Sequence, residues 1–105
     1  MNRFTKTIAV TAVAAGTFVS TTVAHVQSER YVLVSHAPDS DSCWNTIKNA
    51  MALAGEQMGV TVEYRNPPTG DLADMARIID QVAASNPDGI ITTLADFDVL
   101  KGPIR

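Results

Sequence analysis

The sequence predicts an α/β fold, a three-layer sandwich in which helices cover both faces of a parallel sheet. Short β-rich runs at residues 31–35, 60–64 and 89–94 alternate with two longer stretches whose apolar residues recur at helical spacing. Strands separated by helices of about four turns must run parallel. If the right-handed crossovers leave the first strand toward opposite sides, the spatial order of the strands is second, first, third. The expected arrangement is therefore β-α-β-α-β with strand order 2-1-3.

The first strand and helix follow a flexible start at residues 25–30. Residues 31–35 form a short run rich in β-branched and aromatic side chains. Gly59 supplies the backbone freedom that ends the helix, and alternation over residues 60–64 predicts the second strand. The apolar positions of this first helix share one stripe, which is formed by Trp44, Ile47, Met51, Ala54 and Met58.

The second helix begins after a loop at residues 65–70, which contains two prolines and a glycine. Asp71 is placed to cap this helix, and residues 85–87 stop it. Residues 89–94 then form the third strand. The apolar stripe of the second helix consists of Leu72, Met75, Ile79 and Val82, widened by Ile78 and Ala83.

Residues 1–24 have the three parts of a secretory signal peptide. Arg3 and Lys6 precede an apolar stretch at residues 8–19, and small residues lead to a cleavage point at Ala24. The alternative is an uncut N-terminal membrane anchor. In either case the rest of the chain is exported, and we expect a periplasmic protein without direct membrane insertion once the leader is cleaved.

Charge and cysteine content exclude several classes of function. Without the leader, six basic residues stand against eleven acidic ones, a formal charge of −5. Such a chain is a poor partner for nucleic acid or anionic lipid. A single cysteine, Cys43, excludes an internal disulfide framework and multi-cysteine zinc sites. We expect Cys43 to be a buried or half-buried structural thiol.

Polar side chains gather in the two loops that the strand order brings together. Winding reverses between the first and third strands, and open α/β sheets bind ligands in the crevice at such a point. Carboxylates and hydroxyls bind the OH groups of a ligand, and an aromatic face packs on its C–H side. Since neither loop holds a basic group, a neutral sugar or polyol fits better than an anion. The candidates are His36, Asp39, Ser40, Asp41 and Trp44 in the first loop, and Thr92, Thr93, Asp96, Phe97 and Asp98 in the second.

Other interpretations of these residues stay open. Asp39, Asp41 or Ser42 can cap the first helix, and Asp96 or Asp98 can cap a helix that starts near Val99. Trp44 can belong to the core, and His36 can be an ordinary loop histidine. A calcium or magnesium ion held by Asp39, Asp41, Asp96 and Asp98 lacks the spacing of an EF-hand.

No catalytic motif is present. The sequence contains no GxGxxG turn, phosphate loop, HExxH or nucleophile elbow. An exported hydrolase using Cys43 or the acids is therefore the minority interpretation, because flanking acids raise rather than lower a thiol pKa. We expect no enzyme activity, no cofactor and no metal.

The segments "YVLVSHAPDSDSCWNTIKNAMALAGEQMGV" and "DLADMARIIDQVAASNPDGIITTLADFDVL" resemble the N-terminal lobe of ribose-type sugar-binding proteins of bacterial ABC importers. The resemblance implies a periplasmic solute receptor of two lobes that closes on a sugar and presents it to an ABC permease in the inner membrane. A periplasmic sensory partner with the same fold is the alternative.

By position, the resemblance places Cys43 and Trp44 where such proteins often carry an aromatic pair. A thiol thus replaces one ring, which leaves the sugar undefined. Residues 31–105 correspond to an incomplete N-terminal lobe that stops inside its third helix. Since the third strand is then an uncovered edge, we expect the isolated chain to be partly unfolded or self-associating.

Overall fold

The computed structural model describes residue 16 and residues 27–105 of the 105-residue chain. Apart from Gly16, the predicted signal peptide lies outside these described residues, as do the first two residues of the expected flexible start. Six elements follow in the order β1 (Arg30–Val34), α1 (Trp44–Met58), β2 (Thr61–Arg65), α2 (Leu72–Ala84), β3 (Gly89–Thr92) and α3 (Phe97–Leu100).

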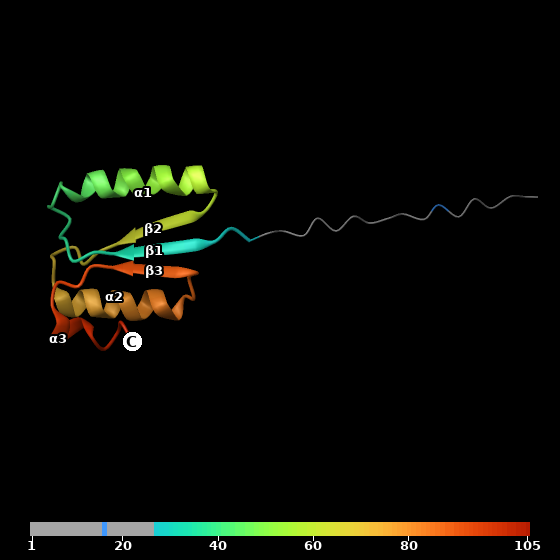
Figure 1. Cartoon of the computed structure of the whole chain (residues 1–105). Helices are drawn as coiled ribbons and strands as arrows, with labels where there is room; N and C mark the ends of the chain where they lie inside the picture. Colours follow the sequence, from blue (N-terminus) through green and yellow to red (C-terminus); the bar gives the residue numbers. More distant parts are fainter. Residues whose placement is uncertain (1–15, 17–26) are drawn as a thin grey trace, which may run out of the picture.

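The three strands form one parallel sheet in the order β2-β1-β3, which confirms the predicted fold class and topology. All three arrows point the same way in Figure 1. In the centre of the sheet, Val32 lies opposite Glu63 on one side and Ile90 on the other. β3 ends two residues earlier than expected.

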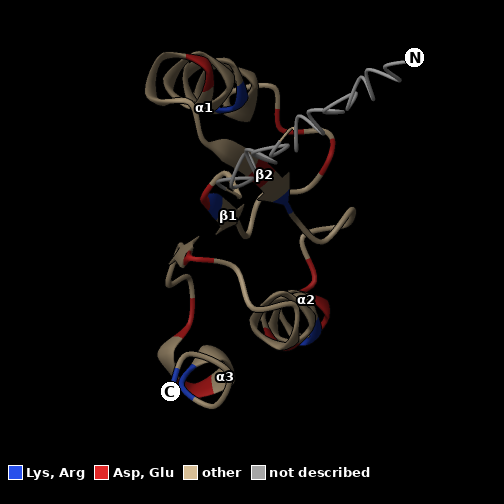
Figure 2. Cartoon of the chain, turned by 90° about the vertical axis from the view of Figure 1, so that its right-hand side faces the viewer, with Lys and Arg blue, Asp and Glu red and all other residues tan. Residues whose placement is uncertain are grey.

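Helices cover both faces of the sheet. Figure 2 shows α1 on one side, with α2 and α3 on the other. Two predicted helix boundaries are confirmed: Gly59 ends α1 in the left-handed conformation with φ 67°, and the Asp71 side chain accepts a hydrogen bond from the Asp74 N–H at the start of α2. Such local signals fix where each helix begins or ends.

The core lies between the sheet and the α2 face. Val32 and Val34 of β1 point into it, and the central residues of α2 meet them there. Burial of each such side chain stabilises the fold by about 1.5–3 kcal/mol. The buried cluster consists of Val32, Val34, Met75, Ile78, Ile79, Val82 and Leu100.

The opposite face is only partly filled. The predicted apolar stripe of α1 is not buried as a core: Ile47 is 41% exposed and Met58 is 73% exposed. Gly55 is the one buried residue of α1, because it approaches β2 so closely that a Cβ atom there would lie 2.8 Å from Val62 Cγ2. A cavity of about 270 Å³ with apolar walls remains between α1 and the sheet, and Ile91 lines part of it.

Within the described residues, no helix combines the length and the apolar character needed to cross a membrane.

Candidate functional site

The loops that leave β1 and β3 meet at the carboxyl edge of the sheet. Both turn at the same end of the strands, opposite the end where the chain enters (Figure 1). The His36 N–H donates to Thr93 Oγ1 at 3.1 Å, and His36 Nδ1 lies 2.9 Å from the same oxygen. These contacts bring one candidate residue of each loop together across 57 residues of sequence.

Ser35 fixes the start of the first loop. Its side chain is fully buried. Ser35 Oγ accepts a hydrogen bond from the Ala37 N–H at 2.9 Å and lies 2.8 Å from the Tyr64 hydroxyl. Because buried polar groups must be paired, this arrangement determines the direction in which the chain leaves β1.

The loop after β2 supports the first loop from the side. The Asn66 amide donates to the Ala37 carbonyl and to Asp39 Oδ1, each at 2.9 Å. The Asp39 N–H in turn donates to the Pro68 carbonyl at 2.9 Å. Asp39 is therefore held in place, although its side chain is solvent-accessible. Sequence reasoning missed Asn66; the available signal was its position at the end of the strand that neighbours β1.

An aromatic cluster lies beside these loops. Trp44 is half-buried. Its ring meets His36 edge-on, with centroids 5.8 Å apart and planes at 88°, and lies 6.1 Å from the Tyr64 ring. The Lys48 ammonium is 4.7 Å from the centroid of Tyr64. Tyr64 and Lys48 were not among the candidates, although Tyr64 lies near the carboxyl end of β2 and Lys48 lies one turn after Trp44.

Two of the candidate carboxylates bind backbone groups. Asp96 caps α3 by accepting the Val99 N–H at 3.0 Å, so the capping interpretation of Asp96 is confirmed. Asp41 accepts the Cys43 N–H at 3.1 Å. No side chain caps α1 itself, contrary to expectation, because Asp41 bonds one residue before the helix begins. Both carboxylates keep lone pairs for further donors.

Cys43 is a free, exposed thiol directly before α1, at its N-cap position. The expectation of a buried or half-buried structural thiol is therefore wrong. Cys43 faces solvent at the N-cap position of α1, whereas Trp44, the first residue of the helix, packs beside Tyr64. His36 engages Thr93 through Nδ1, so its ring is oriented by a hydroxyl.

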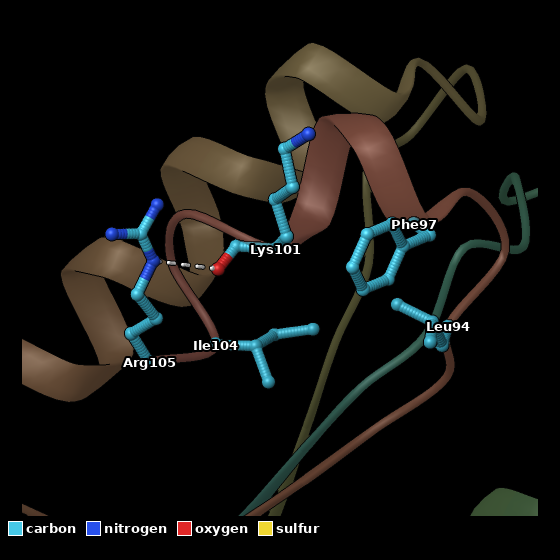
Figure 3. Close-up of a pocket in the computed structure, with 5 residues that line it drawn as sticks. All are labelled: Leu94, Phe97, Lys101, Ile104 and Arg105. Carbon is cyan, nitrogen blue, oxygen red and sulfur yellow. Dashed lines mark hydrogen bonds between the residues drawn. The ribbon is translucent and has the colours of Figure 1, made fainter.

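Phe97 lies in a different group of side chains. Phe97 is 65% exposed, and the Lys101 ammonium lies 5.5 Å from the centroid of its ring. Figure 3 shows Phe97 with Leu94 and Ile104 around an open groove beside α3, whose volume is about 410 Å³.

The acidic candidate residues were also considered as ligands of a cation. Among the described residues, no three His, Cys, Asp or Glu side chains cluster as metal ligands. The four acids considered for a cation therefore do not form one site. In Figure 2, basic positions appear in both helix layers and in the sheet.

Two solved structures share this fold. No family model and no curated protein matches the chain. The arabinose-binding protein AraP of Geobacillus stearothermophilus matches with a TM-score of 0.64 and 28% identity, over 74% of this chain and 27% of that protein. The glucose-galactose-binding protein GanP of the same organism matches with a TM-score of 0.63 and 29% identity, over 74% of this chain and 29% of that protein.

The chain thus spans little more than a quarter of the length of these two proteins. It has the fold of the matching part of a sugar-binding protein. The predicted resemblance is supported at that level, while ribose itself is not indicated, since the two similar structures are described by arabinose and by glucose and galactose.

Proposed function

We propose that this chain forms the N-terminal lobe of a periplasmic solute receptor that binds a sugar or a sugar-like polyol for an ABC importer. The observation that carries the proposal is the joining of the β1 and β3 loops through His36 and Thr93, beside the ring of Trp44. This arrangement occurs in a fold shared with two sugar-binding proteins.

The chemistry of the carboxyl edge suits a hydroxylated ring. Trp44 supplies an aromatic face for the C–H side of a sugar, since apolar C–H groups pack on such faces. Asp39 and Asp41 supply acceptors for hydroxyl donors, and charge-assisted hydrogen bonds of this kind are the stronger ones. The residues that we propose as ligand contacts are His36, Asp39, Asp41, Cys43, Trp44, Thr93, Asp96 and Phe97, and we add Tyr64. Phe97 lies apart from the others, beside α3.

Binding is favoured over catalysis for two reasons. Both similar structures are binding proteins. In addition, His36 Nδ1 is engaged by Thr93, whereas activation of Cys43 as a nucleophile requires a base within hydrogen-bond reach. The periplasmic location and the inner-membrane permease rest on the predicted signal peptide and on the resemblance described above.

A titration followed by amide and indole NMR shifts tests the proposal. L-arabinose, D-galactose and D-glucose are added to the full chain up to tens of millimolar, because one lobe alone offers only part of a site and a Kd of roughly millimolar is expected. We expect concentration-dependent shifts at His36, Thr93 and the Trp44 indole for at least one sugar. Absence of shifts for all three, or shifts confined to the amino edge of the sheet, contradicts the proposal.

Two threonine variants supply the matched comparison. Thr93→Val removes the hydroxyl that joins the loops, and we expect sugar affinity to fall at least several-fold. Thr61→Val makes the same chemical change at an exposed position at the amino end of β2, and we expect affinity to stay unchanged. Equal affinity in the two variants contradicts a site at the carboxyl edge.

A further inference from the structure

The Thr93 hydroxyl makes two contacts with a single residue of the other loop. The His36 backbone N–H donates to Thr93 Oγ1 at 3.1 Å, and His36 Nδ1 lies 2.9 Å from the same oxygen. A threonine hydroxyl has one hydrogen to donate and two lone pairs that accept. Because a backbone N–H can only donate, it occupies one of these lone pairs. The hydrogen of the second contact therefore belongs either to the hydroxyl or to Nδ1.

The first contact decides between these two arrangements. If Nδ1 carried the hydrogen, two N–H groups of His36 would point at one oxygen, and the hydroxyl hydrogen would need an acceptor elsewhere. Among the described residues, Thr93 Oγ1 bonds with His36 alone, and Thr93 is half-buried. If the hydroxyl donates to Nδ1 instead, Thr93 Oγ1 accepts one hydrogen and donates one. Since polar groups removed from water are as a rule paired, this second arrangement is favoured.

An accepting Nδ1 determines where the ring carries its hydrogen. In a neutral imidazole one nitrogen is an N–H and the other an acceptor, so the hydrogen lies on Nε2. Trp44 meets the ring edge-on, with centroids 5.8 Å apart, and the ring is thus held by Thr93 and by Trp44. His36 is exposed to solvent, and among the described residues its ring donates and accepts only through Nδ1. The Nε2–H is therefore a donor that this part of the fold does not use.

We propose that Thr93 holds the neutral His36 ring in the tautomer with its hydrogen on Nε2, and that this N–H donates to an oxygen of the bound ligand. The second part rests on the proposed function, whereas the first concerns the chain alone. The ionised carboxylates of Asp39 and Asp41, in the same loop, can only accept hydrogen bonds. His36 thus makes the site selective for a ligand that combines an acceptor oxygen with hydroxyl donors. A deoxy analogue that lacks this oxygen leaves the N–H unpaired and binds less well.

NMR of histidine rings labelled with nitrogen-15 tests the tautomer without any ligand. The sequence contains two histidines, so the parent variant His25→Gln leaves His36 as the only ring observed. At the alkaline plateau of its titration, we expect Nδ1 to show the chemical shift of a bare ring nitrogen and Nε2 that of an N–H. Thr93→Val in this parent removes the hydroxyl, and we expect both shifts to move toward those of free histidine, whose tautomers exchange. Thr93→Ser keeps the hydroxyl, and we expect the shifts of the parent.

Three results overturn the assignment of the tautomer. The first is a hydrogen on Nδ1 in the parent. The second is a pair of parent shifts equal to those of free histidine, a result that needs no folded Thr93→Val. The third is identical shifts in the parent and in Thr93→Val, with the fold of both verified by far-UV circular dichroism.

Two variants of His36 test whether Nε2–H donates to a sugar. His36→Asn places an amide near the position of Nδ1, where it can still bond with Thr93, but it has no group at Nε2. His36→Gln places an amide N–H near the position of Nε2 and gives up the bond to Thr93. In the titration with the three sugars, we expect His36→Asn to raise Kd about tenfold, the value of one hydrogen bond, and His36→Gln to raise it less.

An unchanged Kd in His36→Asn, or an equal rise in the two variants, overturns the donor role of Nε2. If the unmodified chain binds none of the three sugars, the proposed function and the donor role fail together. The nitrogen shifts of the ligand-free chain still decide the tautomer in that case, so the two failures are distinguishable.

Discussion

Replacement of Ser35 by alanine tests how the carboxyl edge of the sheet is held. The buried Ser35 hydroxyl accepts the Ala37 N–H and pairs with the Tyr64 hydroxyl. In Ser35→Ala, the Ala37 N–H loses its acceptor in a residue that is only 1% exposed. An unsatisfied buried donor costs about 1–3 kcal/mol. Tyr64 is half-buried, so its hydroxyl can turn to water. We expect Ser35→Ala to lower the free energy of unfolding by about 2 kcal/mol.

Tyr64→Phe separates the two hydrogen bonds. It removes the contact between the side chains but leaves Ser35 Oγ accepting the Ala37 N–H. We expect a loss of about 1 kcal/mol, the net value of one hydrogen bond whose partner stays satisfied. Both variants are compared with the unmodified chain by urea unfolding, followed by far-UV circular dichroism and by fluorescence of Trp44, the only tryptophan.

The difference between the free energies of unfolding of the two variants tests whether Ser35 holds the first loop through the Ala37 N–H. If Ser35→Ala and Tyr64→Phe cost the same, the Ala37 N–H contributes nothing and the reasoning is wrong. If Ser35→Ala costs nothing at all, Ser35 does not hold the first loop. A drop in the slope of unfolding against urea, rather than in the midpoint, would point instead to a loss of two-state behaviour.

Three further variants test other parts of the fold. Asp71→Ala removes the cap of α2 and is expected to lower the free energy of unfolding, measured with urea, by about 1 kcal/mol. An unchanged free energy of unfolding would contradict the capping role. Gly55→Ala forces a methyl group against Val62. Overpacking costs about 1–3 kcal/mol, which exceeds the helix-propensity gain of about 1 kcal/mol, so Tm should fall. The added change Val62→Ala should reduce that fall in Tm. The hydrogen bond from Arg30 lowers the pKa of Glu63 below its ordinary value of 4.5. The ion pair therefore stabilises the folded chain fully at a pH above the pKa that Glu63 has in the unfolded chain. This stabilisation is lost as the pH falls through the lower pKa that Glu63 has in the folded chain. The Tm of Glu63→Gln should thus lie below that of the unmodified chain at pH 7 and approach it near pH 3; a constant difference would contradict the assignment.

Local signals in the sequence were sufficient for the topology. Asp71 and Gly59 mark helix ends through contacts with residues only a few positions away, so their effects can be read without knowing the fold. The strand order was then predicted from the alternation of β-rich and helical segments, with right-handed crossovers taken to leave the first strand toward opposite sides. The boundary of β3 was less predictable, because Thr93 leaves the strand to bind His36, 57 positions earlier.

Packing of α1 could not be predicted from the pattern. The apolar stripe indicated a buried helix, but burial depends on how closely the helix approaches the sheet. That distance is set by Gly55 against Val62, a contact that follows from no spacing rule. Met58 is exposed, although it belongs to the predicted stripe.

Part of the candidate site was predictable and part was not. His36, Trp44 and Thr93 were identified because each follows a strand at the carboxyl edge. Asn66 and Tyr64 were missed, because their roles depend on contacts between loops that adjoin only in the folded sheet. A search of the second strand's carboxyl end would have found both.

The most direct test of the central claim is a set of intermolecular NOEs between the C–H protons of a bound sugar and the protein. We predict contacts from the sugar to the indole protons of Trp44 and to the His36 ring, with L-arabinose or D-galactose as ligand. A sugar site between the β1 and β3 loops would be contradicted if the sugar contacted no residue of the carboxyl edge. It would also be contradicted if all contacts lay in the apolar cavity between α1 and the sheet, around Tyr31 and Met58.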